Sequence, residues 1–557
     1  MKIHPQTLLF VAFQLLFSFA IKAQFTHQDS LRGTLSPIRA CYDVTFYDLK
    51  LKVIPTSQSI EGSNTIYYKS TTDFKKMQVD LFANMQIVNI SQHDKPLKFS
   101  RDGNAFFLNI NFADIQKKGK AYSIKIDYCG KPQIARNPPW DGGFSWKKDP
   151  NGKDWIVVSC EGVGASLWFP NKDHLSDEPD SVRITCAVPK GLTCVSNGNL
   201  RSTKEAKTET QASDNKQLNG IPSMPYSEFE WFVSYPINNY NITLNIADYA
   251  NFKDVYTAQD GEKLDLDYYV LKPNLEKAKA HFKQVKPMLA CYEKYFGKYP
   301  FWKDGYALVE TPYWGMEHQS AVAYGNNYKS NEYGFDFIII HESGHEYFGN
   351  SLSCNDHAEM WIHESFTTYM EALYVECTQG YERSIKYLEK QKAGIRNGEP
   401  LIGPLGVNYP QPDSDIYYKG TWMLHTLRNV VNDDKIWFET LKGLATKFKI
   451  SNVSTQQIID YFNEKTGKNL TTVFDMYLKT KHIPTLQYQL TPKNNTVELR
   501  YRYKDATDSM PIKAGFGLTN YEIINPNNEW QTKVFQKVEG QELKIATELF
   551  YVKAEKI

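Results

Sequence analysis

The sequence has few cysteines, no excess of either charge and only one long hydrophobic run. Its 557 residues include 8 cysteines and no C-x-x-C pair, which excludes a scaffold built mainly on disulfides. The 64 basic and 63 acidic residues leave a formal net charge of +1. A nucleic-acid partner is therefore not expected, because such binding needs a concentrated basic surface. With 41% hydrophobic residues, the chain can fill several cores.

Most of the cysteines are expected to be buried thiols. Cys186 and Cys194 lie symmetrically about a Pro-Lys-Gly turn in "CAVPKGLTC". A hairpin at this turn would bring the two side chains opposite each other. Spacing alone does not decide between a disulfide and two free thiols.

The single hydrophobic run, residues 8–21, is interrupted only by Gln14 and Ser18 and follows a basic start at Lys2. This pattern predicts a secretory signal peptide over residues 1–23, cleaved after Ala23. The alternative is a membrane anchor, but the run is shorter than the roughly 20 residues that a spanning helix needs. We therefore expect an exported protein, periplasmic or secreted, without stable membrane insertion.

The rest of the chain predicts three regions of an α+β multidomain fold. Residues 24–250 contain short β-branched and aromatic runs separated by turns, such as "YDVTFYDLKLKVI" and "NITLNIADY", which indicate β-sheet. The polar segment 204–220 is expected to be a loop between two of these strands. Residues 251–482 are mainly helical in pattern. Strand patterns return in residues 483–557, which we expect to form a small β-sandwich.

The segment "HESGH" lies within the helical region and places two histidines four residues apart. On a helix, His341 and His345 point within about 40° of each other. Glu342 lies beside them. This is the H-E-x-x-H pattern, in which the histidines bind zinc and the glutamate acts as general base. The pattern alone does not establish a metal site, because histidines with this spacing also occur on ordinary helices.

A catalytic zinc needs a third protein ligand, and "MWIHESFTTYMEALYVEC" supplies Glu364. The 18 residues between His345 and Glu364 are rich in turn formers, so two antiparallel helices can close a site of two histidines and one glutamate. Glu371, on the same face as Glu364, is either an acceptor that orients a ligand histidine or a surface acid. The remaining nearby histidines lack partners at ligand spacing and are expected to be structural or exposed: His357, His363 and His425.

The chain resembles the zinc aminopeptidases of the aminopeptidase N and leukotriene hydrolase family in three features: "HESGHEYFGN", the 18-residue interval between His345 and Glu364, and "WIHESFTTYME". Three further segments agree in the family's order: "WGMEHQSAVAYGN" resembles its G-x-M-E-N motif, "IYYKGTWMLHTL" its Y-x-K-G segment, and "SCEGVGASLWFP" a segment with a second amine-binding residue. The resemblance covers residues 41–483. It implies a saddle-like β-sheet domain, a thermolysin-like catalytic domain and one zinc ion per chain.

The resemblance also implies roles for single residues. Glu317 and Glu161 would bind the free α-amine of a peptide substrate, with Gly315 and Met316 beside it, and Tyr417 would stabilise the oxyanion. The family's asparagine after the motif glutamate is replaced by His318, so contacts to the first peptide unit are open to change. We do not expect His318 to bind the metal.

The predicted function is zinc-dependent hydrolysis of the N-terminal peptide bond of peptides. A zinc endopeptidase is the main alternative, and it would require that Glu317 and Glu161 do not converge on the cleft. A non-catalytic peptide-binding protein on the same fold is a further alternative, although no ligand and no general base has been lost. The sequence specifies neither the preferred N-terminal residue nor the oligomeric state.

Overall fold

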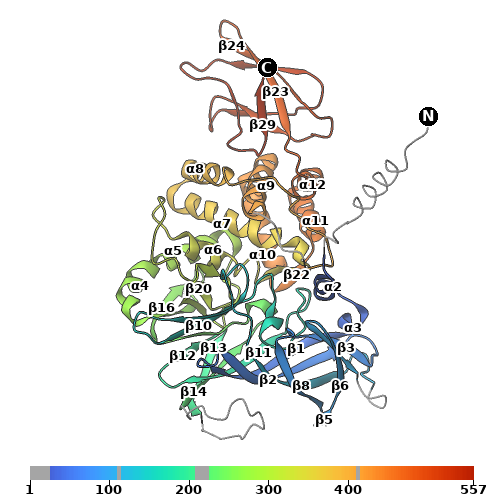
Figure 1. Cartoon of the computed structure of the whole chain (residues 1–557). Helices are drawn as coiled ribbons and strands as arrows, with labels where there is room; N and C mark the ends of the chain where they lie inside the picture. Colours follow the sequence, from blue (N-terminus) through green and yellow to red (C-terminus); the bar gives the residue numbers. More distant parts are fainter. Residues whose placement is uncertain (1–24, 110–114, 207–224, 409–413) are drawn as a thin grey trace, which may run out of the picture.

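The computed structural model describes residues 25–109, 115–206, 225–408 and 414–557. Figure 1 shows three regions that follow one another in space as in the sequence, with the N-terminal sheets (blue to green) at one end and the last strands (red) at the other. The predicted signal peptide lies outside the described residues, as does most of the predicted loop at 204–220. Within the described ranges, no helix is long and apolar enough to cross a membrane.

The N-terminal region is built on an eight-stranded sheet. In spatial order its strands are β13 (Asn199–Ala206), β14 (Tyr226–Val233), β11 (Ser181–Pro189), β1 (Tyr42–Ile54), β2 (Ser59–Ser70), β8 (Ala121–Gly130), β4 (Met85–Gln92) and β5 (Lys95–Pro96). The long strand β1 shows why these residues form a sheet. Its buried side chains include Tyr47, Leu49 and Leu51, which alternate with more exposed neighbours. This alternation with period two buries one face against the core.

Two smaller sheets complete the region. One contains β12 (Thr193–Val195), β15 (Asn245–Ala247), β10 (Asp154–Ser159) and β9 (Gly143–Lys148), and the other contains β3 (Lys76–Asp80), β7 (Ala105–Asn109) and β6 (Lys98–Asp102). The hairpin considered for Cys186 and Cys194 does not form. Cys186 lies on β11 and Cys194 on β12, which belong to different sheets, and both are buried free thiols.

The central region begins with a five-stranded sheet. Its order is β16 (Tyr249–Thr257), β17 (Lys263–Leu271), β18 (Tyr306–Glu310), β20 (Val322–Tyr324) and β19 (Gly315–Met316). β19 pairs only with β20, in the antiparallel direction. This short strand, which holds the glycine and methionine of the W-G-M-E segment, is therefore an edge strand, with one side available to other groups.

Helices form the rest of the central region. They are α4 (Leu275–His281), α5 (Val285–Phe296), α6 (Phe337–Gly344), α7 (Trp361–Gln379), α8 (Tyr381–Lys392), α9 (Asp415–Val431), α10 (Asp434–Lys447), α11 (Thr455–Thr466) and α12 (Thr471–Lys479). The two-stranded sheet of β21 (Leu352–Cys354) and β22 (Ser451–Val453) lies among them. Asp336 caps α6 by accepting from the Ile338 amide at 3.1 Å.

A glycine lets α9 pack closely on α7. A Cβ at Gly420 would lie 1.7 Å from Ser365 Oγ, so no larger residue fits there without displacement. Ser365 Oγ donates to the Ile416 carbonyl at 2.6 Å, which joins the two helices further. The close approach brings Tyr417, at the start of α9, towards the helix that carries Glu364.

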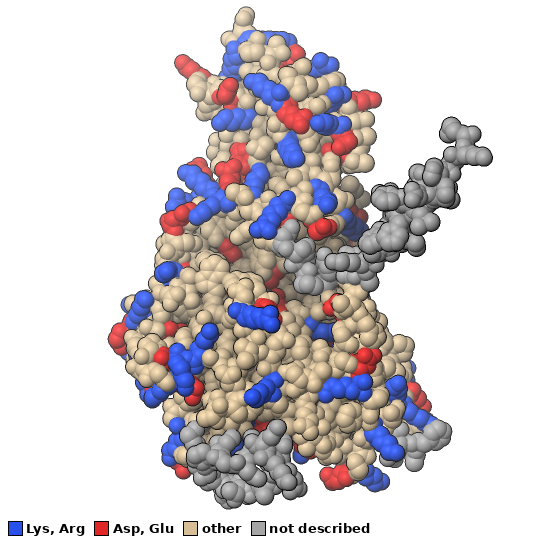
Figure 2. Space-filling view, viewed as in Figure 1, with Lys and Arg blue, Asp and Glu red and all other residues tan. Residues whose placement is uncertain are grey.

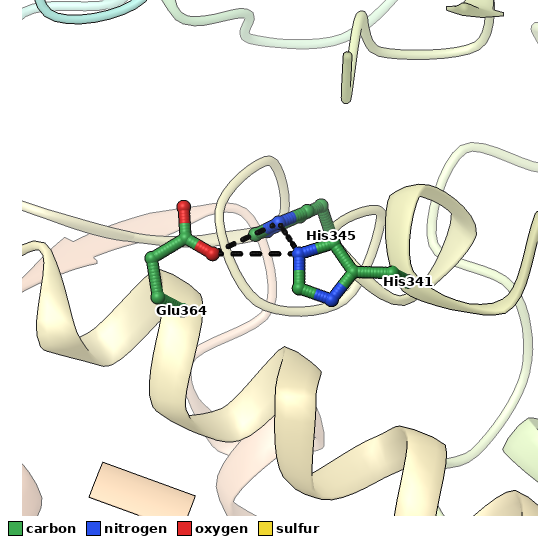
Figure 3. A group of neighbouring side chains, drawn as sticks. All are labelled: His341, His345 and Glu364. Atoms are coloured by element: carbon green, nitrogen blue, oxygen red, sulfur yellow. Dashed lines mark hydrogen bonds and ion pairs between the residues drawn. The ribbon is translucent and has the colours of Figure 1, made fainter. Parts of the chain in front are cut away.

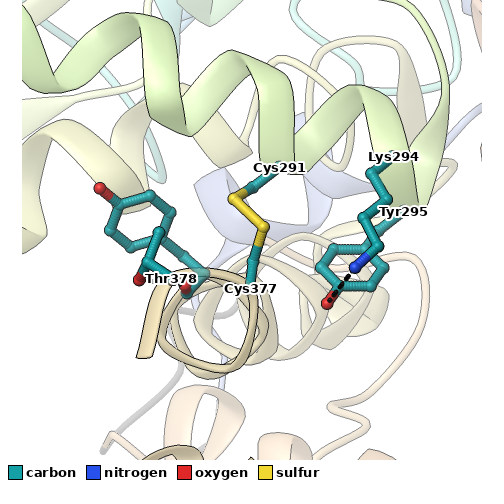
Figure 4. The surroundings of a disulfide bond; sticks show 6 residues. Cys291, Lys294, Tyr295, Cys377 and Thr378 are labelled. Atoms are coloured by element: carbon teal, nitrogen blue, oxygen red, sulfur yellow. Dashed lines mark hydrogen bonds between the residues drawn. A yellow bond between two sulfur atoms is a disulfide. The ribbon is translucent and has the colours of Figure 1, made fainter. Parts of the chain in front are cut away.

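A disulfide joins two helices of the central region (Figure 4). Cys291 on α5 and Cys377 near the end of α7 are bonded, with their Cα atoms 6.1 Å apart. The sequence did not indicate this pair, because 86 residues separate the two cysteines and neither lies in a recognisable motif. The bond attaches the far end of α7 to a neighbouring helix.

The C-terminal region consists of two small sheets. One has the order β27 (Gln531–Gln536), β24 (Thr496–Tyr503), β23 (Thr485–Pro492) and β29 (Lys553–Lys556), and the other has β26 (Tyr521–Ile524), β25 (Ile512–Gly515) and β28 (Lys544–Ile545). The predicted fold class is confirmed: a β-sheet domain, a mainly helical domain and terminal sheets follow in that order. Basic and acidic side chains are interspersed over the face shown in Figure 2.

Candidate active site

Three side chains from α6, its C-terminal cap and α7 converge on one point (Figure 3). His341 Nε2 and His345 Nε2 are 3.2 Å apart, and each lies 3.5 Å from Glu364 Oε2. All three residues are buried or nearly so. The structure thus brings together the three side chains that the sequence suggested as metal ligands.

The other nitrogen of each imidazole faces a hydrogen-bond acceptor. His341 Nδ1 lies 2.7 Å from Glu371 Oε1, and His345 Nδ1 lies 3.0 Å from the Phe348 carbonyl. These contacts place the ring proton on Nδ1 and direct the Nε2 lone pairs towards each other. Of the two interpretations of Glu371, the structure favours the one in which it orients a ligand histidine.

The donor set fits a zinc ion. A tetrahedral site with bonds of about 2.0 to 2.1 Å has ligand-to-ligand distances of about 3.3 to 3.4 Å, close to the three distances found here. Glu364 Oε2 is buried and has no hydrogen-bond partner among the described residues. Two facing lone pairs and an unpaired carboxylate oxygen need a cation between them, since buried polar atoms are costly when unsatisfied.

Glu342 stands beside this cluster and is held against the edge strand. A Cβ at Gly315 would lie only 2.4 Å from Glu342 Oε1, so a side chain at this position would push the carboxylate from where it stands. Burial raises the pKa of Glu342, and the neighbouring His341 and His345 oppose that rise. A carboxylate with this surrounding can accept a proton near neutral pH more readily than an exposed one.

Two further carboxylates enter the same cavity, which has a volume of about 660 Å³. Glu317, next to the edge strand, has an oxygen within 4.8 Å of both a Glu342 oxygen and a His345 ring nitrogen. Glu161 follows β10 and comes from the N-terminal region. Burial and nearby acids, first Glu364, raise the pKa of Glu161 to about 8. Burial and Glu161 raise the pKa of Glu317 well above its usual range.

The surrounding chain holds both Glu317 and Glu161 in place. Tyr240 Oη donates to Glu317 Oε1 at 2.9 Å, and Asn350 Nδ2 donates to the Glu317 carbonyl at 2.8 Å. Arg32 Nη1 donates to the Gly162 carbonyl at 2.6 Å, next to Glu161. The position of Glu317 therefore depends on a contact between the N-terminal and central regions, whereas the segment of Glu161 is held within the N-terminal region.

The tyrosines of the Y-x-K-G segment both line the cavity. The ring of Tyr417 stacks on that of His341, with centroids 5.9 Å apart and an interplanar angle of 29°. Burial and the nearby Glu364 raise the pKa of Tyr417 well above its usual range, so its hydroxyl stays protonated and can donate. Tyr418 lies against Gly394 instead: a Cβ added at Gly394 would come within 2.6 Å of the Tyr418 ring.

The remaining histidines lie outside the ligand cluster. His318 is fully buried, and burial lowers its pKa to about 3. Neither ring nitrogen has a hydrogen-bond partner within the described chain. His363 is also fully buried and accepts from the Cys354 amide at 3.1 Å, and His425 is buried beside Trp422. His357 has its pKa lowered to about 3 by burial.

Some residues of the site could not be recognised in the sequence. Tyr240 reaches Glu317 from another region of the fold, and no motif marks it. Thr367 Oγ1 lies 3.2 Å from His345 Nδ1. Thr367 follows Glu364 by three residues on the same helix face, and this spacing could have identified it from the sequence. Trp140 and Trp314 line the cavity from two different regions, and only the position of Trp314 beside the G-x-M-E segment pointed to it.

Comparison with protein-family models identifies both parts of this arrangement. Residues 281–477 match the peptidase family M1 domain, and residues 44–223 match the peptidase M1 N-terminal domain. The chain belongs to peptidase family M1. The resemblance drawn from the motifs is thereby confirmed, as is the prediction that the protein is a metallopeptidase. Membership in this family of zinc enzymes agrees with the donor set of His341, His345 and Glu364.

Similar M1 peptidases have been characterised in several organisms. The chain is 21% identical to leukotriene A-4 hydrolase of Xenopus laevis over 503 residues, which cover 84% of this chain and 76% of that one. It is 22% identical to the puromycin-sensitive aminopeptidase of Caenorhabditis elegans, covering 82% of this chain but only 49% of that protein. It matches 44% of mouse aminopeptidase B. The chain thus spans about half the length of these two aminopeptidases.

Solved structures show the same fold. An alanine variant of an M1 zinc metallopeptidase from Deinococcus radiodurans, bound to a Tyr-Ser-Ala substrate, superposes with a TM-score of 0.65 at 17% identity. The match covers 80% of this chain and 95% of that one. At 17% identity this similarity supports a shared fold, and it carries no conclusion about the substrate of this chain.

Proposed function

We propose that the protein is a zinc-dependent aminopeptidase that removes the N-terminal residue of peptides, with one zinc ion per chain. The observation that carries the proposal is the pair Glu161 and Glu317. Both face the cavity that contains the ligand cluster and Glu342, and neither has a cationic partner in the described parts of the chain. A protonated α-amine would satisfy both carboxylates at once.

The arrangement also accounts for cleavage after one residue. The oxygen of Glu317 is within 4.8 Å of a ring nitrogen of the ligand His345. An ammonium held by Glu317 and Glu161 therefore leaves room for a single residue before the scissile carbonyl reaches the ligand cluster. An endopeptidase would need an open path past these two acids, which both line the cavity.

The chemistry requires few groups. His341, His345 and Glu364 would hold the zinc, which polarises the scissile carbonyl and lowers the pKa of water when bound. Glu342 accepts the proton of the attacking water and returns it to the leaving amine. Tyr417 donates to the oxygen on which negative charge develops. Glu371 keeps His341 oriented throughout, because the 2.7 Å contact to Nδ1 fixes the ring.

The test compares a free peptide with its N-acetylated twin at pH 7.5. Acetylation removes the charge that the two acids would bind and leaves buried carboxylates unpaired, so kcat/KM should fall at least ~100-fold, or about 2.7 kcal/mol. Glu317→Ala should reduce this ratio mainly by slowing the free peptide. Equal cleavage of both peptides, or preferred cleavage of internal bonds in a long capped peptide, would establish the endopeptidase instead. Tight peptide binding without turnover by zinc-loaded protein would indicate a non-catalytic binding protein.

We also propose that the protein is exported. The pattern of residues 1–23 supports this, and so does the disulfide between Cys291 and Cys377, because such bonds persist mainly in oxidising compartments. N-terminal sequencing of protein recovered from the periplasm and the medium of the producing cells should give Gln24 as the first residue. Full-length protein confined to the cytoplasm would contradict the proposal.

A further inference from the structure

Two tryptophans at the mouth of the cavity are unusually exposed for residues of this size. Trp140 is 62% exposed and Trp314 is 46% exposed, and both line the cavity. Their ring centroids are 6.2 Å apart, at an interplanar angle of 59°. Large aromatic surface left in water next to a binding cavity is informative, because burying it on a ligand is favourable.

The side chain of Trp314 and the loop that carries Trp140 are held in place before any ligand arrives. Trp314 Nε1 donates to Asn326 Oδ1 at 3.1 Å, and its ring meets Phe337 edge to face at 5.3 Å. The loop that carries Trp140 is closed by Asp141, whose Oδ2 accepts from the amides of Arg136 and Asn137. We name Trp140, Trp314 and Phe337 the aromatic wall. A wall that is already ordered binds an apolar group without a large entropic cost.

The aromatic wall lies along the part of the cavity that the first substrate residue would occupy. Trp314 directly precedes Gly315, whose Cα faces the general base Glu342. Trp140 also borders a second hollow, which is lined by Gly162 and Val163, the residues that follow Glu161. The wall therefore has Trp314 next to the strand residue that contacts Glu342, and Trp140 next to the residues that follow Glu161.

Other lining residues of the cavity are polar. Asn331, Lys390 and Gln391 are among them, and Gln391 Nε2 donates to Glu371 Oε2 at 3.0 Å. Lys390 is paired there with Glu332 at 2.8 Å. The acids of the cavity already have other tasks in the proposed mechanism, so none is left to pair with a basic substrate side chain. Among the described large apolar side chains that line the cavity, only Trp140 and Trp314 are exposed.

We propose that the aromatic wall is the specificity site of the enzyme and that it selects peptides whose first residue is aromatic or a large aliphatic one. The proposal rests on the proposed aminopeptidase function and deepens it. It assigns binding of the first side chain to Trp140 and Trp314, one from each of the two regions that form the cavity.

The test uses two series of free tripeptides, X-Ser-Gly and Ala-X-Gly, with X as Phe, Leu, Ala, Lys or Glu. In the first series kcat/KM for Phe and Leu should exceed that for Ala at least ~10-fold, a difference typical of filling an apolar pocket. The second series should vary less. Preference for Ala, Lys or Glu at the first position, or a stronger response to the second position, would overturn the proposal.

Substitutions show which side chains cause the preference for an aromatic or large aliphatic first residue. Trp140→Ala and Trp314→Ala should each bring the Phe-to-Ala ratio to within ~3-fold, whereas Trp314→Phe should retain most of it. The matched control is Trp530→Ala, since this tryptophan lies against Arg500 and Arg502 in the C-terminal region. The control should keep the wild-type ratio. An unchanged ratio in both cavity variants would also overturn the proposal.

A binding measurement keeps the inference testable if a tryptophan variant does not fold. In zinc-loaded Glu342→Gln protein, Phe-Ser-Gly should bind at least ~10-fold more tightly than Ala-Ser-Gly and should change the tryptophan emission, which Ala-Ser-Gly should change less. Equal affinities would reject the proposed specificity. Failure of the aminopeptidase function is distinct: it would appear as equal cleavage of acetylated and free peptides, whatever the first residue.

Discussion

The two ends of the cavity, which we propose bind the metal and the substrate amine and call the metal-binding end and the amine-binding end, are built in different ways. His341, Glu342, His345 and Glu364 come from α6 with its C-terminal cap and from α7, and 18 residues lie between His345 and Glu364. Glu161 and Glu317 come from different regions of the fold, and Glu317 is held by Tyr240 from a third segment. The first end is a local structure that two helices can form, whereas the second exists only when the N-terminal and central regions are packed together.

The difference predicts how each end should respond to change. A substitution at the metal-binding end should remove the metal or the chemistry outright, because each residue there has a single role. A substitution at the amine-binding end should change the discrimination between substrates and leave the metal in place. The predictions below test this contrast, in order of decreasing effect.

Glu364→Ala should abolish both metal binding and turnover. Removing one of three ligands leaves two imidazoles, which hold zinc far more weakly. Metal analysis of purified protein should give close to one zinc per chain in the wild type and almost none in the variant. Glu382→Ala, an exposed acid on α8, is the matched control and should keep its zinc. Full metal retention in Glu364→Ala would exclude Glu364 from the ligand set.

Glu342→Gln should lower kcat by about 10³-fold, within the range typical of general acid–base catalysis. Zinc content should stay at the wild-type level, because Glu342 Oε1 faces the edge strand at Gly315 and is not one of the three converging ligand atoms. The two measurements on one sample separate catalysis from metal binding. A wild-type rate in the zinc-loaded variant would refute the assigned base.

Tyr417→Phe should reduce kcat by about 100-fold with little change in KM, since the phenol donates to charge that exists only in the transition state. Tyr418→Phe is the matched control. Both tyrosines line the cavity, but only Tyr417 stacks on His341. A larger loss in Tyr418→Phe would show that the neighbouring tyrosine is the donor.

Cys291→Ser should lower the free energy of unfolding by about 2 to 4 kcal/mol, because the disulfide closes a loop of 86 residues. Equilibrium denaturation should show this shift, while kcat of the folded variant should remain near the wild-type value. Cys129→Ser, at a partly exposed free thiol, should have little effect. A large loss of kcat at unchanged stability would mean that the bond positions the α7 ligand directly.

Tyr240→Phe should produce the smallest change. The variant loses one hydrogen bond to Glu317, worth about 0.5 to 1.5 kcal/mol, so kcat/KM for a free peptide should fall by roughly 2- to 12-fold. The acetylated twin does not use this contact and serves as an internal control. An equal fall for both peptides would mean that Tyr240 supports the fold in general and not the amine-binding end.

The contrast between the two ends also explains what the sequence could predict. The ligand set follows from helical periodicity and one turn, which are local properties, so His341, His345 and Glu364 were identifiable from their spacing. Glu317, Glu161 and Tyr417 were suggested only by resemblance to a family. Tyr240 and Trp140 were missed because their roles depend on how two regions pack, and no local pattern encodes that packing.

Prediction of the fold from the sequence is limited in the same way. Alternating and helical patterns were sufficient to predict the three regions. They were not sufficient to pair cysteines: the turn between Cys186 and Cys194 suggested a hairpin, but the two strands belong to different sheets. The observed bond joins cysteines 86 residues apart. Long-range pairing follows from the arrangement of whole elements, which spacing does not reveal.

The contact between Gly315 and Glu342 has a consequence for evolution of the enzyme. On that face the base is bounded by main chain and not by another side chain. A strand changes its pairing in steps of a whole residue, whereas packed side chains adjust by fractions of an ångström. A side chain at position 315 or a one-residue shift of the strand register would therefore move the Glu342 carboxylate, so the glycine and the register of this strand are constrained together.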